Sequence, residues 1–382
     1  MASINRATLP QAFLDSVSAA MMLPQPEPQY WFARAALGNQ LRAEGIRNGN
    51  MSGLGYIQSI MGTGGVPDAL DSMVRAADAY PESIKSLDEH FGEGMGTLYK
   101  FKRRVFEGGG YTEASREVTM DSTTSTTGKN IQMEEVEVQL KQFEGPYDTT
   151  ASAVAPYAIS DFDKRWGAMA LRDGLTGEVF THLMRDRIKW LDTVLRDRFR
   201  STDNITFADA SVTSVSSFTS SAGFTANLEM IKRARKSLAD REWAPFANGR
   251  YILLVPSEFD VQMLNDLSYR QLSKNLGDGR NQIFGAIGSI HNVDIFECTT
   301  LKTYAATDSV PNDTTVPSGA TVYECLMFGP GTVGRACPSG TEAFYADDTN
   351  YGKVAKVIWR AAEALQTLDK RGIQRILFQN AS

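Results

Sequence analysis

One stretch decides how this chain is interpreted: Thr176-Gly-Glu-Val-Phe-Thr-His-Leu-Met-Arg-Asp-Arg-Ile-Lys-Trp-Leu-Asp-Thr-Val-Leu-Arg-Asp-Arg-Phe-Arg200. Apolar side chains recur in it every three or four residues, which predicts one apolar stripe along an α-helix. Such a helix would be about 37 Å long, more than a typical globular helix. The expected packing residues are Phe180, Met184, Ile188, Leu191 and Leu195.

The polar positions of the stretch fit the same helix. Thr176 is a suitable residue to cap its first turn, because a threonine hydroxyl accepts hydrogen bonds from free backbone N–H groups. Asp192 lies one turn before Arg196, a spacing at which opposite charges attract on a helix surface. We therefore expect Asp192 to pair with Arg196 on an exposed face.

A hairpin is predicted upstream of this helix. Residues 135–143 alternate between polar and apolar, with Val136, Val138 and Leu140 on one face of a strand. Residues 114–120 are the expected partner strand, and the turn-forming residues between the two strands include Lys129. A two-stranded ribbon is only marginally stable alone, so it should lie against another surface. Whether that surface belongs to a second subunit stays open at this point.

The remaining chain is of two kinds. Residues 1–110 contain short predicted helices, such as 29–43 and 81–91, between glycine clusters and without a core of their own. They must pack on the rest of the chain or on neighbouring chains. After the long helix comes an α/β unit with predicted helices at 227–243 and 257–267 and predicted strands at 250–256, 293–296, 321–328, 351–361 and 373–378.

Composition excludes several classes of protein. The formal charge of −6 argues against a surface dedicated to nucleic acid. No stretch approaches the roughly 20 apolar residues of a membrane span. The three cysteines, at 298, 325 and 337, lack zinc-like or redox spacing, which favours buried thiols in a reducing compartment.

No pattern predicts a catalytic, cofactor or metal site. The nucleophile-elbow, zinc-protease and phosphate-loop motifs are absent from the sequence. The histidines His90, His182 and His291 are each better interpreted as structural. Two basic clusters, Lys232–Lys236 and the arginines of the long helix, are interpreted as solvated helix faces, with weak, salt-sensitive contact with nucleic acid as the alternative.

The order of these elements resembles the major capsid proteins of tailed bacteriophages, which have the HK97-like fold. Four segments carry the resemblance: Val136-Glu-Val-Gln-Leu-Lys-Gln-Phe-Glu-Gly-Pro-Tyr147, Arg250-Tyr-Ile-Leu-Leu-Val-Pro-Ser-Glu-Phe259, Ile283-Phe-Gly-Ala-Ile-Gly-Ser-Ile-His-Asn-Val-Asp-Ile-Phe296 and Trp359-Arg-Ala-Ala-Glu-Ala-Leu365. The resemblance covers most of the chain from about Tyr111 onward.

The resemblance implies an α+β fold with five parts. These are an extended N-terminal arm at 1–110, an E-loop hairpin at 111–150, a P-domain at 151–224 with its spine helix at 176–200, an A-domain at 225–340, and C-terminal strands at 341–382 that return to the P-domain. In this scheme Val136, Val138, Leu140 and Lys129 contact a neighbouring subunit.

The resemblance also implies a function. Hexamers and pentamers of the chain would form the icosahedral head around double-stranded DNA, in a virion assembled in the cytoplasm of a bacterial host. The implied partners are a portal protein, scaffolding protein and possibly a decoration protein. No charged, coiled-coil-like segment opens the sequence, so we expect separate scaffolding and no removal of the N-terminus. Lys129 is expected to be a solvated turn residue and not a cross-linking lysine.

Two other functions are considered. An encapsulin-type compartment would share the fold and enclose cargo enzymes. An α/β enzyme of another class would use the glycine-containing loop at 277–288 to line its pocket.

Overall fold

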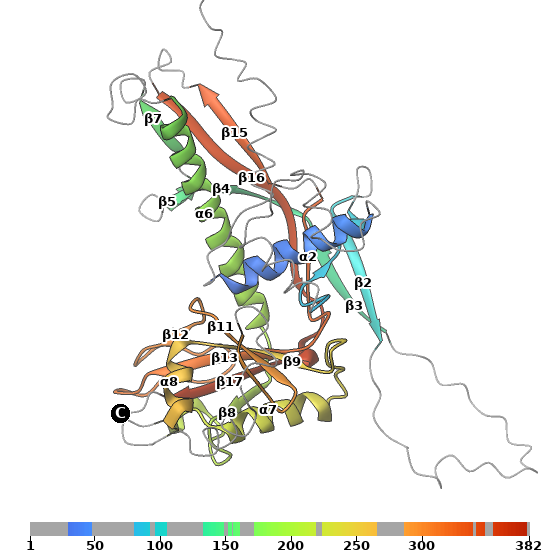
Figure 1. The fold of residues 1–382 in the computed structure, drawn as a ribbon, viewed down its shortest axis with the longest axis vertical. Helices are drawn as coiled ribbons and strands as arrows, with labels where there is room; N and C mark the ends of the chain where they lie inside the picture. Colours follow the sequence, from blue (N-terminus) through green and yellow to red (C-terminus); the bar gives the residue numbers. More distant parts are fainter. Residues whose placement is uncertain are drawn as a thin grey trace, which may run out of the picture.

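The structure is a computed structural model that describes residues 30–47, 80–91, 96–104, 133–148, 152–154, 156–160, 172–218, 224–265, 286–338, 341–347 and 354–379. Figure 1 shows a long helix, α6 (Arg172–Phe199), that runs from one β-sheet at the top of the view to a second sheet at the bottom. A second helix, α2 (Trp31–Arg47), crosses α6 between the two sheets.

Strand β16 (Val354–Thr367) organises the six-stranded sheet. Along one of its edges it pairs with β15 and then β14, and along the other with β7 and then β4. Trp359, Ala361 and Glu363 alternate along β16 and are all buried. The partner strands are β1 (Lys85–Ser86), β4 (Lys141–Gly145), β7 (Tyr157–Ser160), β14 (Val333–Ala336) and β15 (Thr341–Asp347).

The seven-stranded sheet has the order β10-β11-β9-β13-β17-β8, with β12 on β13. Helices α7 and α8 belong with the core on one face of it, while the other face joins the core around α2 and α6. Its elements are β8 (Ile205–Phe207), α7 (Leu228–Asp240), β9 (Tyr251–Val255), α8 (Ser257–Asn265), β10 (Ala286–Ile290), β11 (Val293–Glu297), β12 (Thr303–Tyr304), β13 (Val322–Phe328) and β17 (Ile373–Gln379).

The smaller elements complete the chain. A ribbon, the name used below for β2 (Leu98–Arg104) paired with β3 (Met133–Gln139), projects from the body of the molecule (Figure 1). A short hairpin pairs β5 (Tyr147–Asp148) with β6 (Ala153–Val154), and single 3₁₀ turns lie at Asp88–His90, Val215–Ser217 and Lys370–Gly372.

The predicted long helix is confirmed. Its first residue and the role of the Asp192 carboxylate differ from those predicted. It begins at Arg172, so Thr176 lies inside the helix and does not cap it. Asp192 is buried instead of exposed, and its carboxylate accepts hydrogen bonds from the Ala33 N–H (3.1 Å) and the Thr300 hydroxyl (2.6 Å). The reason is that α2 crosses α6 at this point and presents unpaired N–H groups of its first turn.

Helix α2 belongs to the core of the chain rather than to an extended arm. Phe32 is completely buried and packs on Phe199 of α6, with ring centroids 5.3 Å apart. Trp31 packs on Phe328 of the seven-stranded sheet, with ring centroids 5.5 Å apart. The predicted helix at 81–91 is wrong, because β1 pairs with β14 there and only a 3₁₀ turn follows.

The two sheets also cross the domain limits expected from the sequence. Strand β8 lies before residue 224 and β17 after residue 341, yet both belong to the seven-stranded sheet with β9 and β13. Strand β14 lies before residue 341 but pairs with β16 beside α6. The chain therefore passes between the sheets more often than a simple series of domains predicts, because strand partners are chosen by packing and not by sequence order.

Candidate functional site: the ribbon and the cavity at its base

The ribbon rests on the body of the chain through one apolar face. Its strands pair from Leu98–Gln139 to Arg104–Met133, which places Tyr99 and Val138 on the same face. The ring of His90 stacks on Tyr99 with centroids 4.1 Å apart, and the Lys85 ammonium lies 5.3 Å from the centroid of the Phe101 ring. These contacts anchor the base of an otherwise weak two-stranded sheet.

The opposite face of the ribbon is charged and exposed. The Lys100 ammonium lies 3.2 Å from Glu135 and 3.4 Å from Glu137, and Lys102 lies 3.7 Å from Glu135. Because these side chains are solvated, such pairs add little to stability. Their main effect is to keep the outer face polar and soluble.

The residues predicted to contact a neighbouring subunit have different positions. Val138 is completely buried within its own chain, in a cluster with Leu87, Phe91 and other residues of the six-stranded sheet and its surroundings. Val136 and Leu140 are half-buried, and Lys129 lies outside the described residues. The predicted partner strand at 114–120 also lies outside them, and β3 pairs instead with residues 98–104. Contact of the ribbon with a neighbouring subunit stays a prediction.

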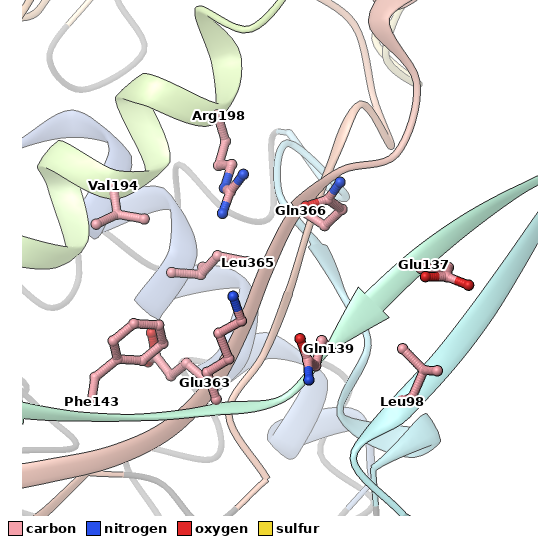
Figure 2. Close-up of a pocket in the computed structure, with 10 residues that line it drawn as sticks. Leu98, Glu137, Gln139, Phe143, Val194, Arg198, Glu363, Leu365 and Gln366 are labelled. Carbon is pink, nitrogen blue, oxygen red and sulfur yellow. The ribbon is translucent and has the colours of Figure 1, made fainter.

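A cavity of about 220 Å³ lies where the ribbon meets α6 and β16. We call it the base cavity (Figure 2). Side chains from α6, β16, β4 and both ribbon strands line it: Leu98, Glu137, Gln139, Lys141, Phe143, Val194, Arg198, Glu363, Leu365 and Gln366.

Both acids of the base cavity already have cationic partners. Glu137 faces Lys100 at 3.4 Å. Glu363 is completely buried and contacts both Arg187 and Arg335, the latter at 2.6 Å. Burial alone would raise the pKa of Glu363, but the Arg187 and Arg335 guanidinium groups outweigh it and lower the pKa.

The two cations of the base cavity differ from its acids. Among the described residues, neither the Lys141 ammonium nor the Arg198 guanidinium finds a hydrogen-bond acceptor or an acid. By contrast, Arg196 of α6 and Arg200, the residue after this helix, each reach a carbonyl or a carboxylate. The base cavity therefore has an excess of unused positive charge.

Two buried clusters of charged residues hold α6 against the sheets. In the six-stranded sheet, Arg187 of α6 meets Glu363, and its guanidinium lies 4.8 Å from the Trp190 ring centroid and 5.0 Å from that of Trp359. In the seven-stranded sheet, Glu324 accepts from Arg200, the residue after α6 (2.9 Å), and from Arg375 (2.7 Å).

The sequence did not reveal these clusters as such, although a signal was present. Glu324 and Arg375 are each the single charged residue of a largely apolar strand, and Glu363 lies in the apolar run that follows Arg360. A charge on a buried strand is rarely tolerated unless it is paired. Its partner cannot be named from the sequence, because Arg200 is 124 residues from Glu324 along the chain.

The other candidate residues are placed as follows. His90 stacks on the ribbon, His182 is exposed on α6, and His291 lies in the turn between β10 and β11. Residues 277–285 of the glycine-containing loop at 277–288 lie outside the described residues. In the basic cluster of α7, Lys232 lies 3.7 Å from Glu229 and Arg233 donates to the Ala208 carbonyl.

The prediction of buried free thiols is confirmed for all three cysteines. Burial and the nearby Glu363 raise the pKa of Cys337 to about 12. Within the described ranges, no three side chains of His, Cys, Asp or Glu converge as metal ligands. No helix in the described part of the chain has the length and apolar composition to cross a membrane.

Comparison with known proteins defines the fold. No protein-family model matches the sequence, and no curated protein is significantly similar to it. Among solved structures, the chain resembles the capsid asymmetric unit of cyanophage Pam1, with a TM-score of 0.58 and 11% identity over 81% of this chain and 92% of that one. It also resembles the capsid of Ralstonia phage GP4, with a TM-score of 0.50 and 14% identity over 79% of this chain and 87% of that one.

At such identities the likeness defines the fold alone. The chain has the mixed helix-and-sheet fold of phage capsid subunits. The α+β class and the resemblance to phage capsid proteins that the sequence predicted are thereby confirmed at the level of the fold.

Proposed function

We propose that this chain is a major capsid protein that assembles as hexamers and pentamers into the icosahedral head of a tailed bacteriophage. One observation carries the proposal: about four fifths of the chain, 81%, superimposes on a phage capsid subunit. The chain would act by self-association and not by catalysis.

The parts of the HK97-like fold can be proposed for the observed elements. We assign the spine helix to α6 and the E-loop to the ribbon with the residues beyond it. The P-domain would be α6 with the six-stranded sheet, and the A-domain the seven-stranded sheet with α7 and α8. These assignments follow strand pairing and therefore replace the sequence-based limits at 224 and 341.

The geometry of the described residues supports a role in assembly. A projecting two-stranded ribbon is weak alone and gains stability when it is covered by another surface. Helix α6 and the residue that follows it, in contrast, are held to the two sheets by buried ion pairs. A rigid body with a projecting ribbon suits subunits that overlap their neighbours in a shell.

The partners follow from the proposed role. Besides copies of itself, the chain would meet a portal protein, a separate scaffolding protein and possibly a decoration protein, and the virion would be assembled in the cytoplasm of a bacterial host. Packaged double-stranded DNA would contact the shell weakly and without sequence preference.

Electron microscopy of the full-length protein, expressed alone and with candidate scaffolding proteins from a phage genome, tests the proposal. Closed shells of uniform size are expected. Small, uniform oligomers under every condition would contradict it, and shells filled with a protein cargo would instead favour an encapsulin-type compartment.

A further inference from the structure

The described lining of the base cavity includes two cationic side chains without a partner, while each of its two acids lies beside at least one cation. Glu137 and Glu363 are paired with Lys100 and with two arginines. Among the described residues, the Lys141 ammonium and the Arg198 guanidinium have no hydrogen-bonding or ionic partner. A site of this kind favours an anion, because each acid already has its countercharge while the two cations do not.

The two cations face the same space from rigid elements. Lys141 of β4 lies directly opposite Glu363 of β16, and residues paired in this way in an antiparallel sheet point to the same face. The carbonyl of Arg198 accepts hydrogen bonds from the hydroxyl groups of Ser201 (2.8 Å) and Thr367 (2.7 Å), which fixes the end of α6. Figure 2 shows the Arg198 guanidinium directed toward Leu365 in the base cavity.

The rest of the lining indicates the chemistry around the anion. Leu98, Phe143, Val194 and Leu365 provide apolar walls, and Leu98 is 51% exposed at the rim. An Asp or Glu side chain fits such a site because its aliphatic stem packs on apolar walls while its carboxylate meets the cations. A DNA phosphate is flanked by polar sugars and would leave these walls wet.

We propose that Lys141 and Arg198 bind a carboxylate side chain of a neighbouring copy of this chain in the base cavity. This rests on the proposed function, which brings copies into contact. Three lining residues, Leu98, Glu137 and Gln139, also belong to the ribbon, so a subunit that covers the ribbon reaches the base cavity as well. The neighbour's carboxylate pairs with both cations, which leaves a net charge of one, and ties the ribbon base, α6 and the adjacent subunit together.

The first test compares assembly of the full-length wild type with that of the double variant Lys141→Glu/Arg198→Glu. We expect the concentration required for shell formation to rise at least about tenfold, because two attractive contacts become repulsive. The thermal midpoint of the unassembled chain should change little, since neither side chain has a partner among the residues that the structure describes. The matched control Arg235→Glu/Lys236→Glu makes the same charge change on α7, outside the base cavity, and should assemble as the wild type does.

The second test identifies the acid. Zero-length carbodiimide cross-linking of shells assembled from mixed isotope-labelled and unlabelled chains should join Lys141 to an Asp or Glu of another copy. The variant Lys141→Gln, which lacks the amine, should lose this cross-link while its other cross-links remain.

Each other outcome has a stated meaning. Wild-type assembly by the double variant, or an equal loss in the α7 control, would overturn the inference while leaving the proposed function intact. Normal assembly with less retained DNA would overturn it in favour of a phosphate ligand. A wild-type chain that never forms shells would overturn the proposed function first, and the inference with it.

Discussion

The two buried charge clusters, one at the middle of α6 and one just after its C-terminal end, use the same residue types in different ways. Each places one glutamate between an arginine of α6 or of the residue that follows it and an arginine of a sheet: Arg187–Glu363–Arg335 in one, Arg200–Glu324–Arg375 in the other. The glutamates are fully buried in both clusters.

The clusters differ in how completely their polar atoms are satisfied. Around Glu324, every nitrogen of the Arg200 and Arg375 guanidinium groups contacts an acceptor, and the Tyr304 hydroxyl donates to Glu324 at 2.9 Å. Around Glu363, three buried atoms have no hydrogen-bond partner among the described residues: Arg187 Nη1, Arg335 Nε and Glu363 Oε2. There, the Arg187 guanidinium is held between Trp190 and Trp359.

This difference indicates that the two sheets hold the same helix with unequal rigidity. A fully hydrogen-bonded buried network resists displacement, because every broken contact leaves a buried charge. An arginine held by aromatic faces can shift along them at less cost, since cation–π attraction depends weakly on position. The joint to the seven-stranded sheet should therefore be the stiffer of the two.

The largest predicted effect removes the common support of both clusters. Leu191 is 1% exposed in the stripe that packs α6 on the core. Leu191→Asp places an unpaired charge there, and we expect a loss of more than about 5 kcal/mol, enough to prevent folding. Circular dichroism and limited proteolysis measure it. Thr193→Asp, at an exposed position of the same helix, is the control, and a cooperatively unfolding Leu191→Asp protein would contradict the packing described here.

The next prediction compares the two glutamates directly. Glu324→Gln leaves Arg200 and Arg375 without a buried countercharge and should lower the free energy of unfolding by about 3–5 kcal/mol. Glu363→Gln should cost about 1–2 kcal/mol less, because fewer hydrogen bonds are broken and aromatic rings still hold Arg187. Urea denaturation measures both. Asp197→Asn, which alters a half-exposed partner of Arg200, should cost less than about 1 kcal/mol. Equal losses for the two glutamates would refute the proposed difference in rigidity.

A third prediction disturbs only the aromatic support of the Glu363 cluster. A Cβ atom on Gly145 would lie 2.5 Å from the Trp359 ring, so Gly145→Ala must displace that ring. We expect a loss of about 1–3 kcal/mol with a shifted tryptophan fluorescence spectrum. Gly249→Ala is a useful control: it has open space but a backbone φ of 76°, so it should cost about 1–2 kcal/mol without a spectral change.

The smallest predicted effect is a dependence on pH. The folded-state pKa of Glu363 lies below its ordinary value of 4.5, so this group contributes stability above pH 4.5 and loses it as pH falls through the folded-state pKa. The difference in unfolding free energy between the wild type and Glu363→Gln should therefore shrink progressively below pH 4.5. A difference that stays constant down to pH 3 would mean that the carboxylate is not preferentially stabilised in the folded chain.

Much of the fold could be predicted from local patterns. The stripe containing Ile188, Leu191 and Leu195 lies buried along one helix, and the apolar runs at 251–255 and 322–328 are strands. These features depend on residues a few positions apart, whose spacing alone sets which side of an element is apolar.

What could not be predicted depends on partners distant in the sequence. Tyr99 and Phe101 of residues 98–104 lie on the apolar face that β2 shares with β3. The local sequence pattern, however, does not favour residues 98–104 over residues 114–120 as the partner strand. Asp192 has the spacing of a surface ion pair and is nevertheless buried, because α2 packs over it. The base cavity likewise combines residues from five elements.

The amino-acid sequence by itself determined the long helix, the alternating strand at the ribbon, the α/β character of the second half and the order that resembles a capsid subunit. Only the tertiary structure decided which strands share a sheet, that α2 belongs to the core, and that Lys141 and Arg198 face one cavity with no side-chain partner in the described part of the chain. The physical reason is range: periodicity is set by neighbouring residues, whereas pairing, burial of charge and cavities arise only where distant segments meet.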